Sequence, residues 1–227
     1  MNTSRTVSIV VGHGGIGRAL AEHLAALGKD VRVWSRASGV DPTREASITA
    51  AVAALDNAVP CEVFVTTGML HDARQRPERS WRDLDADALA RSFLINTIAP
   101  ALIAKHLLPR LARETPALFA VLGARVGSIG DNRTGGWHGY RASKAALAMM
   151  IRTLAIELRR THPLAVCVAL HPGTVDTPMS APFQRGVATD KLFTADFAAQ
   201  RLIAVARALT PADSGGHFAW DGQRIAE

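Results

Sequence analysis

The stretch that decides the fold is Thr6-Val7-Ser8-Ile9-Val10-Val11-Gly12-His13-Gly14-Gly15-Ile16-Gly17. Its β-branched half predicts a strand over 6–11, and the glycine cluster predicts a tight turn from this strand into a helix over 16–27. Glycines at such a turn let backbone N–H groups approach a phosphate at the helix N-terminus. The candidate dinucleotide-binding residues are therefore Gly12, His13, Gly14, Gly15, Ile16 and Gly17.

Strand and helix patterns alternate along the rest of the chain. Further strands are predicted at 31–34, 40–41, 62–66, 117–122, 164–170 and 216–220, and further helices at 42–55, 85–113 (kinked at Pro100), 140–160 and 195–209. Because each helical crossover returns the chain to the same end of the sheet, these strands pair in parallel. The prediction is an α/β fold, a single Rossmann-type doubly wound parallel sheet of about seven strands with helices on both faces. Ligands of such sheets bind at the carboxyl ends of the strands.

Length and composition favour one domain that covers residues 1–227. The chain is 48% hydrophobic, and its net charge of +6 comes from scattered arginines without a basic run, so nucleic-acid binding is not predicted. Its eight histidines lack metal-ligand spacing, which predicts no metal site. Cys61 and Cys167 are expected to be thiols of a reducing compartment. With neither an apolar leader nor a run long enough to cross a bilayer, the chain is expected to be cytoplasmic, with no membrane partner.

Tyr140 is the only tyrosine of the chain, and it stands four residues before Lys144. On a helix this spacing puts both side chains on one face, one turn apart. A phenol with a pKa of about 10 is almost wholly protonated at neutral pH. An ammonium group nearby stabilises the phenolate, which predicts a lowered pKa for Tyr140 and a role in proton transfer. For an isolated pair, the alternative is an ordinary solvated Tyr and Lys.

The second predicted strand is followed by Ser35 and Arg36, and it has no carboxylate where an NAD enzyme usually offers one to the ribose 2′-hydroxyl. Ser35 and Arg36 are suited to a 2′-phosphate, because guanidinium pairs with phosphate through two hydrogen bonds. The predicted cofactor is therefore NADP(H), with NAD(H) less favoured. A plain surface arginine is the alternative.

The glycine loop, the Tyr140–Lys144 helix and the segment Pro172-Gly173-Thr174-Val175-Asp176-Thr177 together resemble the short-chain dehydrogenase/reductase family over essentially the whole chain. The segments 125–129 and 218–222 look like its C-factor-like branch. The resemblance implies that Tyr140, Lys144 and Asn96 are catalytic. It also implies a set of cofactor contacts: Pro172, Gly173, Val175 and Thr177 at the nicotinamide end, Asp41 at the adenine, and Thr67 and Gly68 beside the adenosine.

Three departures from the family pattern stand out. The glycine loop is one residue shorter than usual, and the family's Asn-Asn-Ala-Gly is Val65-Thr66-Thr67-Gly68 here. The serine that orients the substrate carbonyl usually lies thirteen residues before the tyrosine, and that position is Gly127. Ser128 is the favoured replacement. In the alternative alignment the serine position is Gly123 or Ala124, and Ser128 is a loop residue.

The resemblance implies an NADP(H)-dependent oxidoreductase that transfers a hydride between nicotinamide and a small carbonyl or alcohol substrate. Tyr140 is then the general acid or base, Lys144 lowers its pKa and holds the nicotinamide ribose, Asn96 positions a water, and Ser128 hydrogen-bonds the carbonyl oxygen. The alternative, suggested by the serine position, is a non-catalytic NADP(H)-binding sensor or interaction protein. A homodimer or homotetramer is expected by analogy with the family. The irregular segment 177–191 is a predicted lid.

Overall fold

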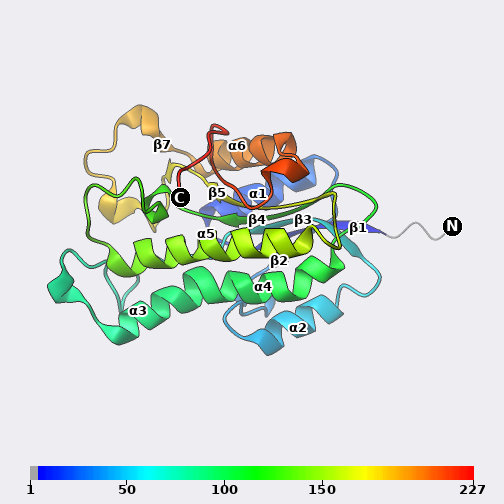
Figure 1. Ribbon diagram of the computed structural model, residues 1–227, viewed down its shortest axis with the longest axis horizontal. Coiled ribbons are helices and arrows are strands. Elements are labelled where there is room, and N and C mark those ends of the chain that lie inside the picture. Colours follow the sequence, from blue (N-terminus) through cyan, green and yellow to red (C-terminus); the bar gives the residue numbers. More distant parts are fainter. Residues whose placement is uncertain (1–4) are drawn as a thin grey trace.

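The computed structural model describes residues 5–227. Six parallel strands form the central sheet in the order β2-β1-β3-β4-β5-β8 (Figure 1). Their bounds are Thr6–Val11 (β1), Val31–Trp34 (β2), Val59–Val65 (β3), Ala117–Leu122 (β4), Ala165–His171 (β5) and His217–Ala219 (β8). Two short strands, β6 (Thr174–Val175) and β7 (Leu192–Phe193), form a separate parallel pair. The predicted parallel sheet is thus confirmed.

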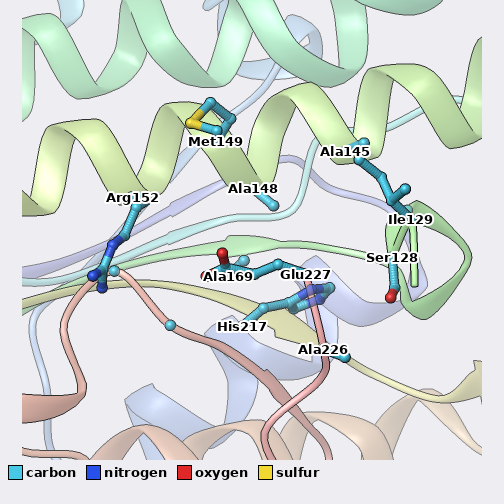
Figure 2. A pocket seen from close by; sticks show the side chains of 13 residues that line it. Ser128, Ile129, Ala145, Ala148, Met149, Arg152, Ala169, His217, Ala226 and Glu227 are labelled. Carbon is cyan, nitrogen blue, oxygen red and sulfur yellow. The ribbon is translucent and has the colours of Figure 1, made fainter. Parts of the chain in front are cut away.

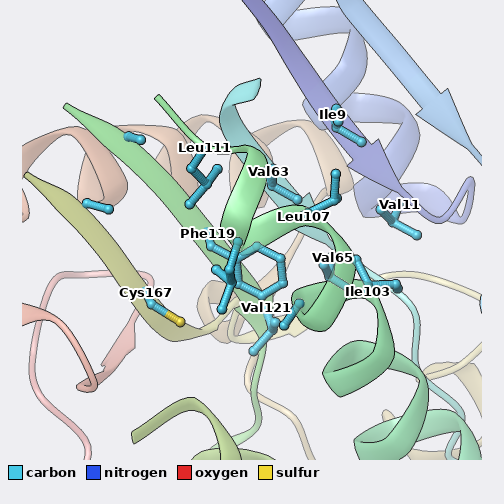
Figure 3. Close-up of a cluster of buried hydrophobic side chains, with 14 of the residues drawn as sticks. Ile9, Val11, Val63, Val65, Ile103, Leu107, Leu111, Phe119, Val121 and Cys167 are labelled. Carbon is cyan, nitrogen blue, oxygen red and sulfur yellow. The ribbon is translucent and has the colours of Figure 1, made fainter. Parts of the chain in front are cut away.

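Helices cover both faces of this sheet (Figure 1). One face carries α2 (Glu45–Ala53), α4 (Ala99–Leu107) and α5 (His138–Leu158), and the other carries α1 (Gly15–Ala26) and α6 (Ala195–Ala208). In the first of these layers, Phe119 of β4 packs against Ile103 and Leu107 of α4, and none of the three is exposed (Figure 3). The doubly wound arrangement follows from these two apolar layers.

The predicted strand at 40–41 is wrong. After β2 the chain forms a 3-10 turn, Arg36–Ser38, and continues to α2, while the Val40 N–H donates to the Ser35 carbonyl. A parallel neighbour of β2 needs a crossover connection of about a dozen residues, and the segment 35–39 is too short for one. The central sheet therefore has β2 at its edge.

The predicted long helix at 85–113 is present, but it has four parts: α3 (Ala86–Phe93), a π-helical turn (Leu94–Ile98), α4, and a 3-10 turn (Leu108–Arg110). The irregularity predicted at Pro100 lies just before that proline, in the π-helical turn. Proline has no N–H, so the Asn96 carbonyl lacks the donor that an α-helix would supply from residue 100. Pro100 therefore interrupts the helical hydrogen-bond pattern at Asn96, a residue of the candidate site.

The run Ala86–Arg110 corrects a second prediction. Its 25 residues are long and apolar enough to cross a bilayer by length and composition, although no such run was expected. Within the fold it is a core element, because Ile103, Ala104 and Leu107 are completely buried against the sheet. That packing accounts for the apolar residues on the buried side of the run, whereas Leu94 and Ile98 are exposed.

Candidate active site

Helix α5 brings Tyr140 and Lys144 to the carboxyl end of β4. The Lys144 ammonium donates to the Leu122 carbonyl at 2.7 Å and lies 5.9 Å from the centroid of the Tyr140 ring. Lys144 is only 4% exposed, although it carries a charge. The pair predicted from the sequence thus lies at the carboxyl ends of the strands, where ligands of such folds bind.

Burial dominates the titration of both groups. It raises the pKa of Tyr140 to about 12 and lowers the pKa of Lys144 to about 8. The lowered pKa predicted for Tyr140 is therefore wrong for the chain alone. The reason is geometric, since the ammonium lies over the ring and is held by a carbonyl, while desolvation penalises the phenolate. At neutral pH the phenol holds its proton.

Asn96 joins three segments of the site. Its side chain accepts a hydrogen bond from the Met69 N–H (2.7 Å) and donates to the Met69 carbonyl (2.9 Å) and to Ser143 Oγ (3.1 Å). A Cβ added at Gly68 would lie 3.6 Å from both Asn96 Oδ1 and Lys144 Nζ. Asn96 and Gly68 therefore lie beside Lys144, as the family resemblance implied. The Asn96 amide is used to fix the chain after β3, which leaves its backbone carbonyl as the group available to a water.

The glycine loop is shaped as a cradle at the start of α1. A Cβ at Gly12, where φ is +110°, would lie 2.4 Å from Thr66 Oγ1, and one at Gly17 would lie 2.4 Å from the Gly12 carbonyl. A Cβ at Gly14 would meet nothing within 4 Å, so this residue faces open space. No side chain caps the helix at Gly14, so the first N–H groups of α1 are available to an anion.

Thr177, from the segment after β6, packs against the glycine loop. Its methyl group would lie 3.1 Å from a Cβ on Gly15, although the two residues are far apart in sequence. The hydroxyl of Thr67, after β3, is buried without a hydrogen-bond partner among residues 5–227. A pyrophosphate fits this arrangement, because free N–H groups, a cradle of small residues and hydroxyl groups lie together at the carboxyl ends of the strands. His13 lies on the loop itself and Ile16 in the first turn of α1, while Gly173, at φ +80°, turns the chain between β5 and β6.

The segment after β2 holds the residues expected at the adenosine end. Ser35 caps the 3-10 turn through Ser38, and Arg36 is exposed at its start. Hydrogen bonds from the Thr43 hydroxyl and N–H hold the pKa of Asp41 below its usual value, with added effects from Arg36 and Arg44. Arg36 therefore lies close enough to Asp41 for their charges to interact.

The candidate serine positions differ in the space around them. A Cβ at Gly127 lies 2.8 Å from Lys144 Cβ, and at Gly123 it would meet His217 Nε2 at 2.5 Å, so the backbone there leaves no room for a serine. Ala124 is buried. Ser128 Oγ accepts a hydrogen bond from the Asp131 N–H at 3.2 Å. Figure 2 shows Ser128 and His217 lining a cavity of about 100 Å³ between α5 and the C-terminal residues; Tyr140 is not among its lining residues.

Aromatic side chains pack beside Tyr140. Trp137 lies edge to face with the Tyr140 ring at 6.3 Å between centroids, and Phe183 lies 5.0 Å from Trp137 and 5.5 Å from His71. The His71 ring Nε2 is also 3.0 Å from the Met179 carbonyl. Phe183 and Met179 belong to the predicted lid, so the segment 177–191 contacts the site through Trp137 and His71.

Sequence reasoning missed two buried polar residues next to this site, Gln75 and Glu78. They are 8% and 4% exposed. They lie in a stretch rich in arginine and acidic residues, which is the composition of a solvated loop. No periodicity marks them, because the polar atoms that they contact belong to helices distant in the sequence.

Comparison with known proteins agrees with this geometry. A family model described as short chain dehydrogenase matches residues 37–188, which include Asn96, Tyr140 and Lys144. C-signal from Myxococcus xanthus is 34% identical over 143 residues, which are 63% of this chain and 81% of that protein. A 1-hydroxy-2-glutathionyl-2-methyl-3-butene dehydrogenase from Rhodococcus sp. (strain AD45) is 32% identical over 190 residues, covering 81% of this chain and 76% of that one.

A solved structure gives the same result in three dimensions. The NADPH-bound carbonyl reductase from chicken fatty liver has a TM-score of 0.82 and 25% identity to this chain. The match covers 98% of this chain and 94% of that one. The sequence motifs, the parallel sheet and these matches agree, and the chain belongs to the short-chain dehydrogenase family.

Proposed function

We propose that this protein is an NADP(H)-dependent oxidoreductase acting on a small carbonyl or alcohol substrate. The observation that carries the proposal is the Tyr140–Lys144 pair at the carboxyl end of β4, in which Lys144 is buried and Tyr140 is half-buried, flanked by Asn96 and the glycine cradle. The NADPH bound to the similar chicken carbonyl reductase supports this choice of cofactor. When bound, the nicotinamide supplies or accepts the hydride.

The residues of the chain perform the proton transfer. Tyr140 is protonated at rest and donates its phenolic proton to the carbonyl oxygen during reduction. The Lys144 ammonium, fixed by the Leu122 carbonyl, stabilises the phenolate that remains. Asn96 holds the chain after β3 in place and leaves its carbonyl for a water that returns the proton. The N–H groups of α1 and the residues of the segment 172–177 would hold the pyrophosphate and nicotinamide ends.

Turnover separates this proposal from the non-catalytic alternative. We expect NADPH oxidation, followed by its absorbance, with at least one member of a panel of aldehydes and ketones. Cofactor binding at micromolar concentration without turnover of any member would instead favour a sensor or interaction protein. The same proposal includes small-molecule substrates and a cytoplasmic location. It also includes a single domain over 1–227 and a homodimer or homotetramer.

Cofactor choice is expected to depend on Arg36. Arg36→Asp should weaken NADPH binding by about 2 kcal/mol or more, because a charge-assisted pair with the 2′-phosphate is replaced by repulsion. NADH binding should change little. Arg159→Asp is the matched control, since it makes the same charge change just after the C-terminus of α5, in the connection that leads to the amino end of β5, whereas Arg36 follows the carboxyl end of β2. Binding is measured by the fluorescence of the reduced cofactor, and equal affinity of the unmodified protein for NADH and NADPH would refute the assignment.

Ser128 stays the proposed carbonyl-orienting residue. Ser128→Ala should lower kcat/KM by about ten- to a thousandfold, the range for losing one hydrogen-bond donor to a developing oxyanion. Cofactor affinity should be unaffected. Steady-state kinetics provide the test, and unchanged kcat/KM would show that the alignment through Gly123 and Ala124 is correct and that another group orients the carbonyl.

A further inference from the structure

Trp137, the residue that precedes α5, has an unusual backbone conformation. Its φ of +52° and ψ of +41° are left-handed, and it follows Gly135 and Gly136 at φ +63° and +66°. Among residues 5–227, Asp56 is the only other non-glycine residue with a positive φ. A bulky residue in this region costs free energy and persists only where its surroundings hold it. Something must therefore fix the entry to the helix that carries Tyr140.

Glu78 is the residue that fixes it. The Trp137 N–H donates to the Glu78 carbonyl at 2.6 Å, and the Gly139 N–H donates to Glu78 Oε2 at 3.2 Å. One residue thus accepts two N–H groups at the start of α5, which no side chain of its own caps. The Glu78 Oε1 atom is buried without a partner among the described residues, and it would lie 2.9 Å from a Cβ on Gly139. The carboxyl group therefore packs directly on the turn before Tyr140.

Glu78 is itself held by the segment 69–83, which we term the strap. Gln75 Nε2 donates to Ser92 Oγ at 2.8 Å and to the Ala88 carbonyl at 3.1 Å, both on α3. At the start of the strap, Met69 is held by the Asn96 side chain. The strap is thus attached to α3 and to the π-helical turn independently of its contact with α5. This arrangement provides a fixed support from which Glu78 reaches the catalytic helix.

We propose that Glu78 is a positioning residue for Tyr140. Its carboxylate accepts the Gly139 N–H just after the left-handed Trp137, whose own N–H is held by the Glu78 main-chain carbonyl that all substitutions keep. The Trp137 ring in turn contacts the Tyr140 ring edge to face. Gly139 is the neighbour of Tyr140 in the chain, so a shift of this turn moves the phenol relative to Lys144. The effect on turnover rests on the proposed function, whereas the effect on the phenol position does not.

The position of the phenol is measurable without any substrate. Because Tyr140 is the only tyrosine, protein made with ring-labelled ¹³C-tyrosine gives one set of ring resonances. We expect Glu78→Ala to shift or broaden these resonances, and we expect the same of Trp137→Ala, which removes the adjacent ring. Gln75→Ala, which loosens the strap from α3 but leaves the contacts to α5, should leave them near their original positions. Ring resonances of Glu78→Ala that coincide with those of the unmodified protein would refute the proposal.

Turnover gives the second readout. Glu78→Ala should lower kcat by about 10- to 100-fold, the scale expected for a misplaced reacting group, with the KM for NADPH changed by less than about twofold. Glu78→Gln keeps an oxygen that accepts the Gly139 N–H and should recover most of kcat. Equal losses of kcat in Glu78→Ala and Gln75→Ala would mean that Glu78 acts only through stability, which contradicts the proposal.

Two further outcomes are distinguishable. If Glu78→Ala does not fold, Glu78→Asp replaces it, because the shorter side chain keeps the charge but no longer reaches the Gly139 N–H, and its ring resonances must then shift. If the unmodified protein turns over no carbonyl at all, the proposed function fails, while the resonances still decide the role of Glu78.

Discussion

Tyr140→Phe is expected to lower kcat for carbonyl reduction by about 10²- to 10⁴-fold, the contribution of a positioned general acid. The variant removes the proton and keeps the ring that contacts Trp137. Among the described residues, no hydrogen-bond partner of the phenol is lost, because desolvation alone accounts for its raised pKa. The free energy of unfolding at neutral pH should therefore change by less than about 1 kcal/mol. Initial rates, NADPH affinity and urea denaturation measure the three quantities.

A pH series adds an internal check. The folded pKa of Tyr140 is about 12, above the value of about 10 in an unfolded chain. Between these values the folded protein keeps a proton that the unfolded chain releases, so stability falls as pH rises through this window. The Phe variant should lack this part of the alkaline loss. A Phe variant that retains full turnover would remove Tyr140 from the mechanism.

Acidification from pH 7 to pH 5 is expected to destabilise the protein by about 2–4 kcal/mol through His171 and His217. Burial lowers their pKa values to about 3 and about 4. His217 lowers the pKa of His171 further, and the positive charges of Arg125 and Lys144 lower both pKa values. His171 Nδ1 and His217 Nε2 have no hydrogen-bond partner among residues 5–227. Below pH 6.5 the two histidines therefore bind protons in the unfolded chain but not in the folded protein, and the free energy of unfolding falls as pH falls.

Substitution locates this acid sensitivity. A His171→Asn, His217→Gln double variant should lose less stability between pH 7 and pH 5 than the unmodified protein. His13→Gln is the control, because His13 is exposed on the glycine loop. Urea denaturation at both pH values measures the difference. An identical pH dependence in the double variant would show that other groups, such as His162, whose pKa burial also lowers, control acid stability.

The sequence predicted the bounds of three strands to the residue, because β1, β2 and β4 are rich in β-branched or apolar residues and have clear polar or glycine boundaries. The strand at 40–41 failed for a topological reason, since its two residues look extended but the chain before them is too short for a crossover. Hydrophobic pattern reports local preference and burial. It does not report whether a strand has a neighbour to pair with.

The site divides in the same way. Tyr140, Lys144 and the glycine cradle were predictable because their function depends on spacing along one helix or one turn. The high pKa of Tyr140 was not, because it depends on the desolvation of the phenol by side chains that the fold brings in from elsewhere in the chain. Glu78 was missed for a related reason, as its partners at Trp137 and Gly139 are more than fifty residues away. Long-range contacts between polar atoms leave no periodic signal in the sequence.

The π-helical turn at Leu94–Ile98 sets the rotational phase between α3 and α4. An α-helix advances by about 100° per residue, so the one extra residue of a π-bulge rotates everything before it by roughly that angle. Asn96 and Thr97 face the interior as a result, while Leu94 and Ile98 are 37% and 46% exposed. Deletion of a single residue within the turn would restore a regular helix. It would also rotate α3 about the helix axis, which moves Ser92 away from its hydrogen-bond partner Gln75. The spacing between Ser92 and Asn96 is therefore under a constraint of length as well as of chemistry, and a deletion of one residue there should be less tolerated than a substitution.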